Sequence, residues 1–342
     1  MFYFCTYFDK HYLVRGLALY RSLREHCPEF RLWVLCMDNT TYHALMGFNL
    51  PGVYPIILEE FEKNDAALKI AKTNRSLIEY YFTCTPSLPL YILNHYPQVD
   101  RITYLDADLF FFSNPAVLFE EIKDASIAIV AHRFPPKLKN LEINGIYNVG
   151  WLSFRRDING LACLQWWRER CIEWCYDRIE NGKFADQKYL DDWINRFPNV
   201  VVLKHKGANL ALWNLGNYHL SHQAGNSLVV DGQPLIFFHF HGLKEITSWW
   251  YDPRGRNYAQ ALSPILRRYI YAPYIKLLLN LRRQLFLSDI RSFSGLKRGA
   301  SHRSEGLFVL ILFMAQQFKR LFSICKNILT GEYIFTIQRG QK

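Results

Sequence analysis

Two aspartates, Asp106 and Asp108, lie in the middle of an apolar and β-prone run that spans residues 101–115. Side chains two apart in an extended segment point to the same face, so the two carboxylates lie together. Two such charges about 4 Å apart repel by roughly 4 kcal/mol at an effective dielectric of 20. Apolar neighbours add to this cost. Either one carboxylate holds a proton or a divalent cation lies between them. Carboxylate sites with open positions suit Mg²⁺ or Mn²⁺ carrying phosphate, so we expect a metal site.

A second polar cluster ends the apolar run of residues 234–240. His239 and His241 are two residues apart and therefore face one side of that strand. Gly242 and Lys244 follow. This pattern is typical of a metal ligand beside a phosphate-binding cation, and a hydrogen-bonded core histidine is the alternative.

The elements that would position these residues alternate between strand and helix patterns. This alternation predicts an α/β fold with a parallel, doubly wound sheet. Ligands of such sheets bind at the carboxyl ends of the strands, where Asp106 and Asp108 lie. We expect Pro86 and Pro89 to break or restart a helix that begins at residue 66. The expected strands are residues 2–8, 31–37, 53–58, 102–105, 126–131, 145–154 and 199–203. Residues 135–140 read as a loop and residues 185–196 as a helix.

Length, composition and cysteine usage limit the class of protein. The chain has 342 residues, of which half are hydrophobic, so it is globular and not disordered. Its eight cysteines form no C-x-x-C pair, which indicates a reducing compartment. The apolar start at Phe2 reads as a first strand and not as a signal peptide. We therefore expect a cytoplasmic protein.

The net charge of +11 is confined to one end of the chain. Residues 263–342 hold 14 Lys or Arg and 3 Asp or Glu, whereas residues 1–262 hold 27 of each. A nucleic-acid-binding protein would carry its basic residues on the folded body, so we expect no nucleic-acid partner. Basic amphipathic stretches such as residues 262–286 and 307–322 fit binding in a membrane interface. We expect residues 256–342 to attach the protein peripherally to the anionic inner face of a membrane. An ordinary basic helical subdomain is the alternative.

Several separated motifs occur in one order along residues 1–250. They are Thr6, Tyr12 with Arg15-Gly16, the Tyr104–Asp108 core, Asn148-Val149-Gly150, Asp186-Gln187 and His239-x-x-Gly242-x-Lys244. Together they resemble the metal-dependent retaining glycosyltransferases of the GT-A fold, of the glycogenin and lipopolysaccharide galactosyltransferase type. The resemblance implies a single GT-A domain over residues 1–255, Rossmann-like, with a mostly parallel sheet and helices on both faces.

The resemblance also implies a role for each matching residue. Asp106, Asp108 and His239 would bind Mn²⁺ (or Mg²⁺). Binding of the donor would involve Thr6 and Tyr12 at the nucleoside, Arg75 at the phosphate or sugar, Asn148 at the sugar and Lys244 at the diphosphate. Asp186 and Gln187 would lie at the anomeric carbon as catalytic residues. Lys244 comes one residue earlier than in the family pattern, which leaves open whether His239 or His241 is the ligand.

The function that follows is transfer of a sugar from a nucleotide-diphosphate sugar, of UDP or GDP type, to a glycan or glycolipid acceptor. Two alternatives stay open. The aspartate pair also matches the nucleophile motif of haloacid-dehalogenase-type phosphatases, although that motif usually stands near the start of the domain. The other alternative is a non-catalytic, membrane-associated sugar-binding adaptor, in which the folded body is only a sugar-binding scaffold.

Overall fold

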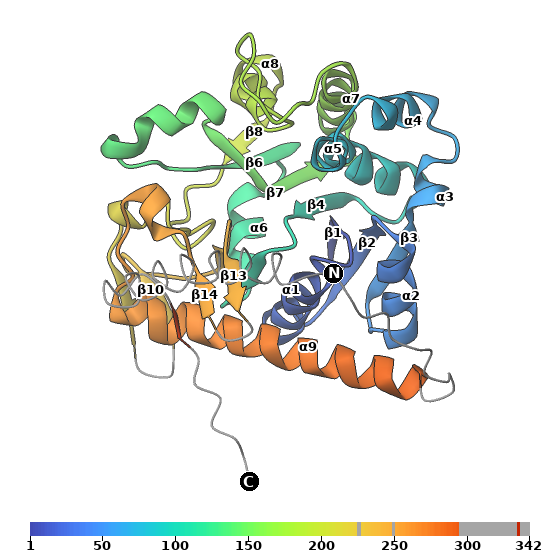
Figure 1. Cartoon of the computed structure of the whole chain (residues 1–342). Helices are drawn as coiled ribbons and strands as arrows, with labels where there is room; N and C mark the ends of the chain where they lie inside the picture. Colours follow the sequence, from blue (N-terminus) through green and yellow to red (C-terminus); the bar gives the residue numbers. More distant parts are fainter. Residues whose placement is uncertain (224–226, 248–249, 294–333, 336–342) are drawn as a thin grey trace, which may run out of the picture. The chain divides into compact units, whose positions relative to one another are not determined.

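The structure is a computed structural model that describes residues 1–223, 227–247, 250–293 and 334–335 (Figure 1). The chain divides into two compact units, Met1–His241 and Gly242–Lys342. The predicted end of the catalytic domain at residue 255 stays a prediction.

The first unit is built on a seven-stranded sheet with the strand order β3-β2-β1-β4-β7-β6-β8. Strands β3, β2, β1 and β4 run parallel to one another, and β6 is parallel to β8. Strand β7 is antiparallel to both β4 and β6. The predicted α/β class with a mostly parallel sheet is therefore confirmed. The strands are β1 (Phe2–Phe8), β2 (Phe30–Cys36), β3 (Val53–Ile57), β4 (Arg101–Leu105), β6 (Ile127–Ala131), β7 (Tyr147–Arg155) and β8 (Val200–Val202).

Helices cover both faces of this sheet, and successive side chains of β1 contact helices on opposite faces. Phe8 points to one face, where Gly16 of α1 packs so closely that a Cβ there would lie 2.2 Å from the Phe8 ring. Tyr7 points to the other face and meets Tyr81 of α5 with ring centroids 6.1 Å apart. Figure 1 shows α4, α5 and α7 together on one side of the sheet and α1 and α2 on the other. The helices are α1 (Leu13–His26), α2 (Asn39–Phe48), α3 (Leu58–Glu62), α4 (Ala66–Thr73), α5 (Leu77–His95), α6 (Ala116–Ile122) and α7 (Ile158–Glu173).

The predicted break at the prolines is wrong, because α5 runs through Pro86 and Pro89 without interruption. The break falls earlier, between α4 and α5, where Ser76 begins α5 with a capping box to Glu79. A proline inside a helix costs about 3 kcal/mol. Both prolines are buried and α5 packs against α7, so burial of the apolar face offsets that cost.

Two other segments differ from their predicted form. Residues 135–140, expected as a loop, enter a 3₁₀ helix, η1 (Pro136–Asn144). The expected helix of residues 185–196 is a 3₁₀ turn, η2 (Lys188–Asp192), followed by the short α8 (Trp193–Arg196). Ala185 has a φ of 45°, in the left-handed region, so it cannot begin a right-handed helix.

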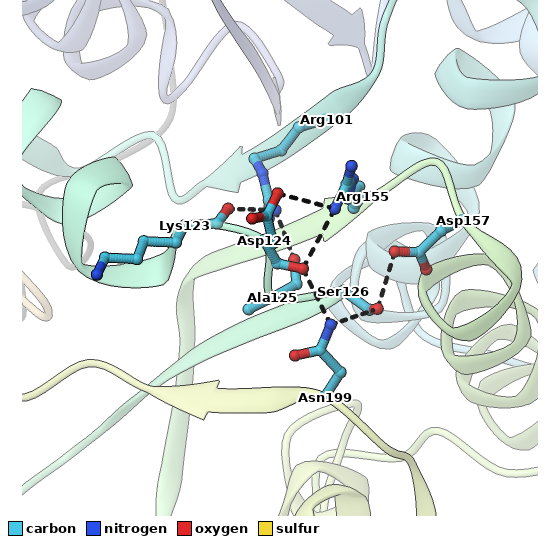
Figure 2. A network of polar contacts seen from close by, with 8 residues as sticks. All are labelled: Arg101, Lys123, Asp124, Ala125, Ser126, Arg155, Asp157 and Asn199. Carbon is cyan, nitrogen blue, oxygen red and sulfur yellow. Dashed lines mark hydrogen bonds and ion pairs between the residues drawn. The ribbon is translucent and has the colours of Figure 1, made fainter.

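A polar network ties the amino-terminal ends of β4, β6 and β8 together (Figure 2). Arg101 donates to the carbonyl oxygens of Lys123 and Ala125. Asn199 donates to the carbonyl oxygen of Asp124 (2.9 Å) and to Ser126 Oγ (3.1 Å). These bonds fix the end of the sheet that lies opposite the carboxyl ends of β1 and β4. The network is therefore structural.

The second unit contains the antiparallel pairs β13–β14 and β14–β15 and a helical segment. Its elements are β13 (Lys244–Thr247), β14 (Trp250–Asp252), β15 (Ile334–Phe335), the π-helix η6 (Leu266–Tyr271) and α9 (Ala272–Phe293). Many apolar residues of the helical segment are buried, among them Ile270, Leu278 and Leu281. No helix among the described residues is both long and apolar enough to span a bilayer. The predicted amphipathic stretch of residues 307–322 lies outside the described residues.

Candidate metal and sugar-nucleotide site

The two aspartates follow β4 directly, at the carboxyl edge of the sheet. The chain then forms the short β5 (Leu109–Phe111), which pairs antiparallel with β12 (Phe237–His239). In this register His239 lies opposite Leu109, and the amide of Phe240 donates to the carbonyl oxygen of Asp108 (3.0 Å). Backbone pairing therefore brings a histidine from the far end of the first unit to the aspartates.

The side chains of this cluster converge on one point. Nε2 of His239 lies 3.1 Å from Oδ1 of Asp108 and 3.6 Å from Oδ2 of Asp106. The hydroxyl of Tyr104 donates to Oδ1 of Asp106 at 2.9 Å. The side chain of His239 is 2% exposed and that of Asp106 is 30% exposed. The cluster is therefore walled by protein on one side and open on the other.

The two carboxyl groups differ in charge state. Burial raises the pKa of Asp106 to about 6; His239 opposes this rise and the charge of Asp108 adds to it. Burial alone would raise the pKa of Asp108 as well, but the charge and hydrogen bond of His239 outweigh it and hold that pKa well below its usual range. Asp108 is therefore the fixed anion of the pair.

His241 joins the same cluster. One ligand atom from each of Asp108, His239 and His241 lies within 4.8 Å of the other two. The indole of Trp213 contacts both imidazoles edge-on, with ring centroids 5.1 Å from His239 and 5.7 Å from His241. Carboxylate oxygens and imidazole nitrogens are suitable donors for a divalent cation. The donor set therefore fits the metal that the sequence predicts, with both histidines within reach.

A chain of polar side chains around Asn148 of β7 lies beside the cluster. Nδ2 of Asn148 lies 3.1 Å from Nε2 of His132 and donates to Oε1 of Gln187 at 3.4 Å. Nε2 of Gln187 donates to the carbonyl oxygen of Asn144 (3.0 Å). Nδ1 of His132 lies 3.3 Å from the carbonyl oxygen of Ile146. Burial lowers the pKa of His132 to about 3, so the ring is neutral. Its Nδ1 donates and its Nε2 accepts, which fixes the orientation of both amides.

Gly150 links this polar chain to the metal cluster. Its carbonyl oxygen accepts from the amide of Asp106 (3.0 Å), and its own amide donates to Oδ1 of Asn148 (3.1 Å). A Cβ at this position would lie 2.7 Å from Oδ1 of Asn148 and 2.8 Å from Cε1 of His239. A side chain larger than hydrogen therefore does not fit.

Asp186 and Gln187, predicted together, lie in different surroundings. Gln187 contacts Asn148, whereas Asp186 is 4% exposed and hydrogen-bonds Thr85 of α5. The indole nitrogen of Trp167 donates to the carbonyl oxygen of Asp186 at 2.8 Å. Burial raises the pKa of Asp186 to about 7; the bond to Thr85 opposes this rise and the charge of Asp106 adds to it. Asp186 is therefore a buried carboxyl group that keeps its proton up to about pH 7.

Thr6 lies near the carboxyl end of β1, and Tyr12 directly precedes α1. Thr6 is fully buried, and among the described residues its Oγ1 has no hydrogen-bond partner. Tyr12 is 39% exposed, and the guanidinium of Arg15 lies 4.4 Å from its ring centroid. Burial raises the pKa of Tyr12, and the charge of Asp108 adds to the rise. Tyr12 therefore offers an aromatic face within electrostatic range of the aspartates.

Arg75 and Lys244 are not joined to this cluster by the contacts of the described residues. Arg75 donates to Asn74 Oδ1 (2.6 Å), to the hydroxyl of Tyr176 (2.6 Å) and to the carbonyl oxygen of Ile172 (3.0 Å). Lys244 is exposed and begins β13 in the second unit. Their roles toward a donor stay predictions.

Sequence reasoning missed His132 and Trp213, which hold predicted site residues in place. His132 directly follows β6, so the rule that polar residues at strand ends form sites could have found it. Trp213 lies outside the regular helices and strands, and no sequence signal marked it.

The chain matches no protein-family model. It is 35% identical over 251 residues to the uncharacterized protein YfnF of Bacillus subtilis (strain 168), covering 71% of this chain and 82% of YfnF. It is 32% identical over 299 residues to the uncharacterized protein YfnD of the same organism, covering 85% of this chain and 91% of YfnD.

Among solved structures, the galactosyltransferase LgtC in complex with donor and acceptor sugar analogs has a TM-score of 0.47 at 15% identity, covering 81% of this chain and 95% of LgtC. Mouse xyloside xylosyltransferase 1 has a TM-score of 0.47 at 14% identity, covering 70% of this chain and 98% of the xylosyltransferase chain. A structural likeness of this size says nothing about activity. The sequence identity to YfnF and YfnD is high enough to decide kinship: the chain belongs to the same family as these two proteins.

Proposed function

We propose that the protein is a glycosyltransferase of the GT-A type, as the resemblance of its motifs implies. It would transfer a sugar from a UDP- or GDP-type donor to a glycan or glycolipid acceptor. It would use a divalent cation, Mn²⁺ or Mg²⁺, and retain the configuration at the anomeric carbon. The observation that carries the proposal is the convergence of His239 on Asp106 and Asp108 at the carboxyl edge of a mostly parallel sheet.

The cluster has the composition and the exposure that a diphosphate site needs. Asp108 and His239 are buried and would anchor the cation, and Asp106 would bind it from the open side. A divalent ion bound there supplies positive charge to the diphosphate as the sugar–phosphate bond breaks. Tyr12, which precedes α1, would stack on the base, and Thr6 of β1 would lie near the nucleoside.

The polar chain on β7 is suited to hold the sugar. In Asn148 and Gln187 the amide hydrogens are directed at His132 and at Asn144. The amide oxygens keep a lone pair each for a ligand, because a carbonyl oxygen accepts two hydrogen bonds. They would therefore accept from sugar hydroxyl groups and lie against the positive charge that develops at the anomeric carbon.

Asp186 would act differently from Gln187. It is buried, faces Thr85 and carries a raised pKa, so it would support the site as a buried carboxyl group that does not contact the sugar. Gln187 lies closer to the sugar subsite through its contact with Asn148. We therefore assign the direct contact with the transferred sugar to Gln187.

Attachment to the inner face of a membrane, with a cytoplasmic location, remains part of the proposal. The charge of the last 80 residues supports it. Most apolar residues of η6 and α9 up to Leu281 are buried, so this segment would supply little of an inserting face. Flotation of the full chain with anionic vesicles tests the idea, and equal flotation with neutral vesicles would contradict it.

Thermal stability with UDP and GDP, each with and without Mn²⁺, tests the proposed function. A nucleotide at 100 times its Kd stabilises the protein by about 2.7 kcal/mol. We expect stabilisation only when the metal is present, and its loss in Asp108→Asn. Hydrolysis of simple phosphate esters that is lost in Asp106→Asn would identify a phosphatase instead. Stabilisation by sugars alone, without a nucleotide effect, would identify a sugar-binding adaptor.

A further inference from the structure

We propose that His241 is a fourth protein ligand of the metal site, and that the site therefore selects a transition-metal ion such as Mn²⁺ or Co²⁺ over Mg²⁺. The inference rests on the proposed function, because it concerns the same cation. The sequence left open whether His239 or His241 is the metal ligand, and the proposal gives this role to both.

The distances bring His241 within reach of the ion. Its ligand atom and those of Asp108 and His239 lie within 4.8 Å of one another. Ligands at about 2.0–2.3 Å from a divalent ion lie about 3–4.5 Å from one another. A movement of less than an ångström by one side chain therefore closes the site. His241 is exposed, so its imidazole would approach the ion from the solvent.

The two imidazoles approach the cluster from different directions. Their ring planes are 86° apart and their centroids are 5.7 Å apart. Trp213 contacts both rings edge-on, so it keeps both imidazoles next to the cluster. His239 points its Nε2 at both carboxylates, so its place in the cluster is set before a metal binds. His241 then adds a donor from the solvent side.

The resulting donor set decides which metal is bound. Two imidazoles and two carboxylates form a mixed nitrogen and oxygen site. Imidazole suits transition-metal ions, whereas Mg²⁺ prefers oxygen donors and keeps several waters. Four protein ligands leave two positions of an octahedral ion, enough for two oxygens of a diphosphate. A site with one imidazole would accept Mg²⁺ more readily than this site does.

The test measures metal binding by the full chain, without a substrate. Titration of Mn²⁺, followed by the electron paramagnetic resonance signal of the free ion, is repeated with Co²⁺ and Mg²⁺ as competitors. The variants are His241→Ala, His241→Asp and His239→Ala, with His43→Ala as the control because His43 is an exposed histidine on α2. Circular dichroism checks that each variant folds.

We expect Mn²⁺ to bind the wild type at least tenfold more tightly than Mg²⁺, and Co²⁺ to bind more tightly still. His241→Ala should weaken Mn²⁺ binding by about tenfold or more. His241→Asp should narrow the preference over Mg²⁺, and His43→Ala should change nothing. Unchanged Mn²⁺ affinity in His241→Ala, or equal binding of Mg²⁺ by the wild type, would overturn the inference.

The same data separate this inference from the proposed function. Loss of Mn²⁺ binding in His239→Ala but not in His241→Ala would remove only His241 from the site. The wild-type titration is repeated with UDP present, and no divalent-ion binding in either titration would remove the metal site and the proposed function with it.

Discussion

Nε2 of His239 lies 3.1 Å from Oδ1 of Asp108, and the side chain of His239 is 2% exposed. The contact depends on the pairing of β12 with β5, which sets His239 opposite the residue that follows Asp108. Burial would lower the pKa of His239, but the charge and hydrogen bond of Asp108 outweigh it and raise that pKa. The pair is therefore preformed and is held together by charge as well as by backbone pairing.

The first prediction concerns the coupling of this pair in the metal-free protein. Asp108→Asn and His239→Gln should each destabilise the protein, because each leaves a buried partner poorly satisfied. The double variant should lose less than the sum, with an interaction energy of about 0.5–3 kcal/mol. Urea unfolding in the presence of a chelator measures all four proteins. Additive losses would show that the two side chains do not interact.

The second prediction concerns Gly150. Gly150→Ala places a Cβ against Asn148 Oδ1 and His239 Cε1, so one of the two side chains must move. We expect a loss of about 1–3 kcal/mol in stability and weaker Mn²⁺ binding. Gly47→Ala is the matched control, since a Cβ there meets no atom within 4 Å. In the helix α2 it should stabilise the protein by about 0.5–1 kcal/mol. If both variants behave alike, Gly150 has no special role.

The third prediction concerns the pH dependence of stability through Asp186. Its pKa is about 7 in the folded protein against an ordinary value of 3.8. Between these values the unfolded chain is ionised and the folded chain keeps its proton, so stability falls as pH rises from about 4 to 7. Asp186→Asn removes this loss. The variant should match the wild type at pH 4 and be more stable at pH 8.

The size of that gain at pH 8 is on the order of 4 kcal/mol at most, for a shift of about three pKa units. Chemical denaturation across the pH range measures it. Asp100→Asn, at an exposed position, is the control and should leave the pH profile unchanged. A gain in Asp186→Asn that does not vary with pH would contradict the assignment of the proton to Asp186.

The fourth prediction concerns His132. His132→Ala removes the acceptor for Nδ2 of Asn148, so both amides lose their fixed orientation. We expect the affinity for a nucleotide sugar to fall by about tenfold, equivalent to about 1.4 kcal/mol, and the affinity for the nucleotide to stay constant. His132→Gln keeps an acceptor and should recover part of the loss. Calorimetry with UDP and a UDP-sugar separates the two effects, and an equal loss for both ligands would count against this role.

The sequence was sufficient to predict that Asp106, Asp108 and His239 come together, because its signals are local. Asp106 and Asp108 alternate with apolar residues at a strand end, and His239 ends another apolar strand. The rule that ligands bind at carboxyl ends of strands then places both in one region. The pairing of β5 with β12 brings them together.

The polar chain around Asn148 could be predicted only in part. Asn148 and Gln187 follow from the motif, but the orientation of their amides depends on His132 and on the backbone of Asn144 and Ile146. These contacts cross between β6, β7 and η1. No spacing within one segment encodes them.

The helix α5 shows where local rules fail. Pro86 and Pro89 predict a break, yet the helix continues because both residues are buried in its contact with neighbouring elements. Tertiary packing outweighs the local propensity there. Ala185 shows the reverse. The sequence predicts a helix over residues 185–196, but the left-handed backbone of Ala185 prevents a helix from starting there.

Anomalous diffraction from crystals of the full chain grown with Mn²⁺ and UDP tests the central claim most directly. The account predicts one manganese peak within coordination distance of Asp108 and His239, with diphosphate oxygens on its open side. A manganese peak at any other place, or bound UDP with no metal between its diphosphate and these two residues, would contradict it.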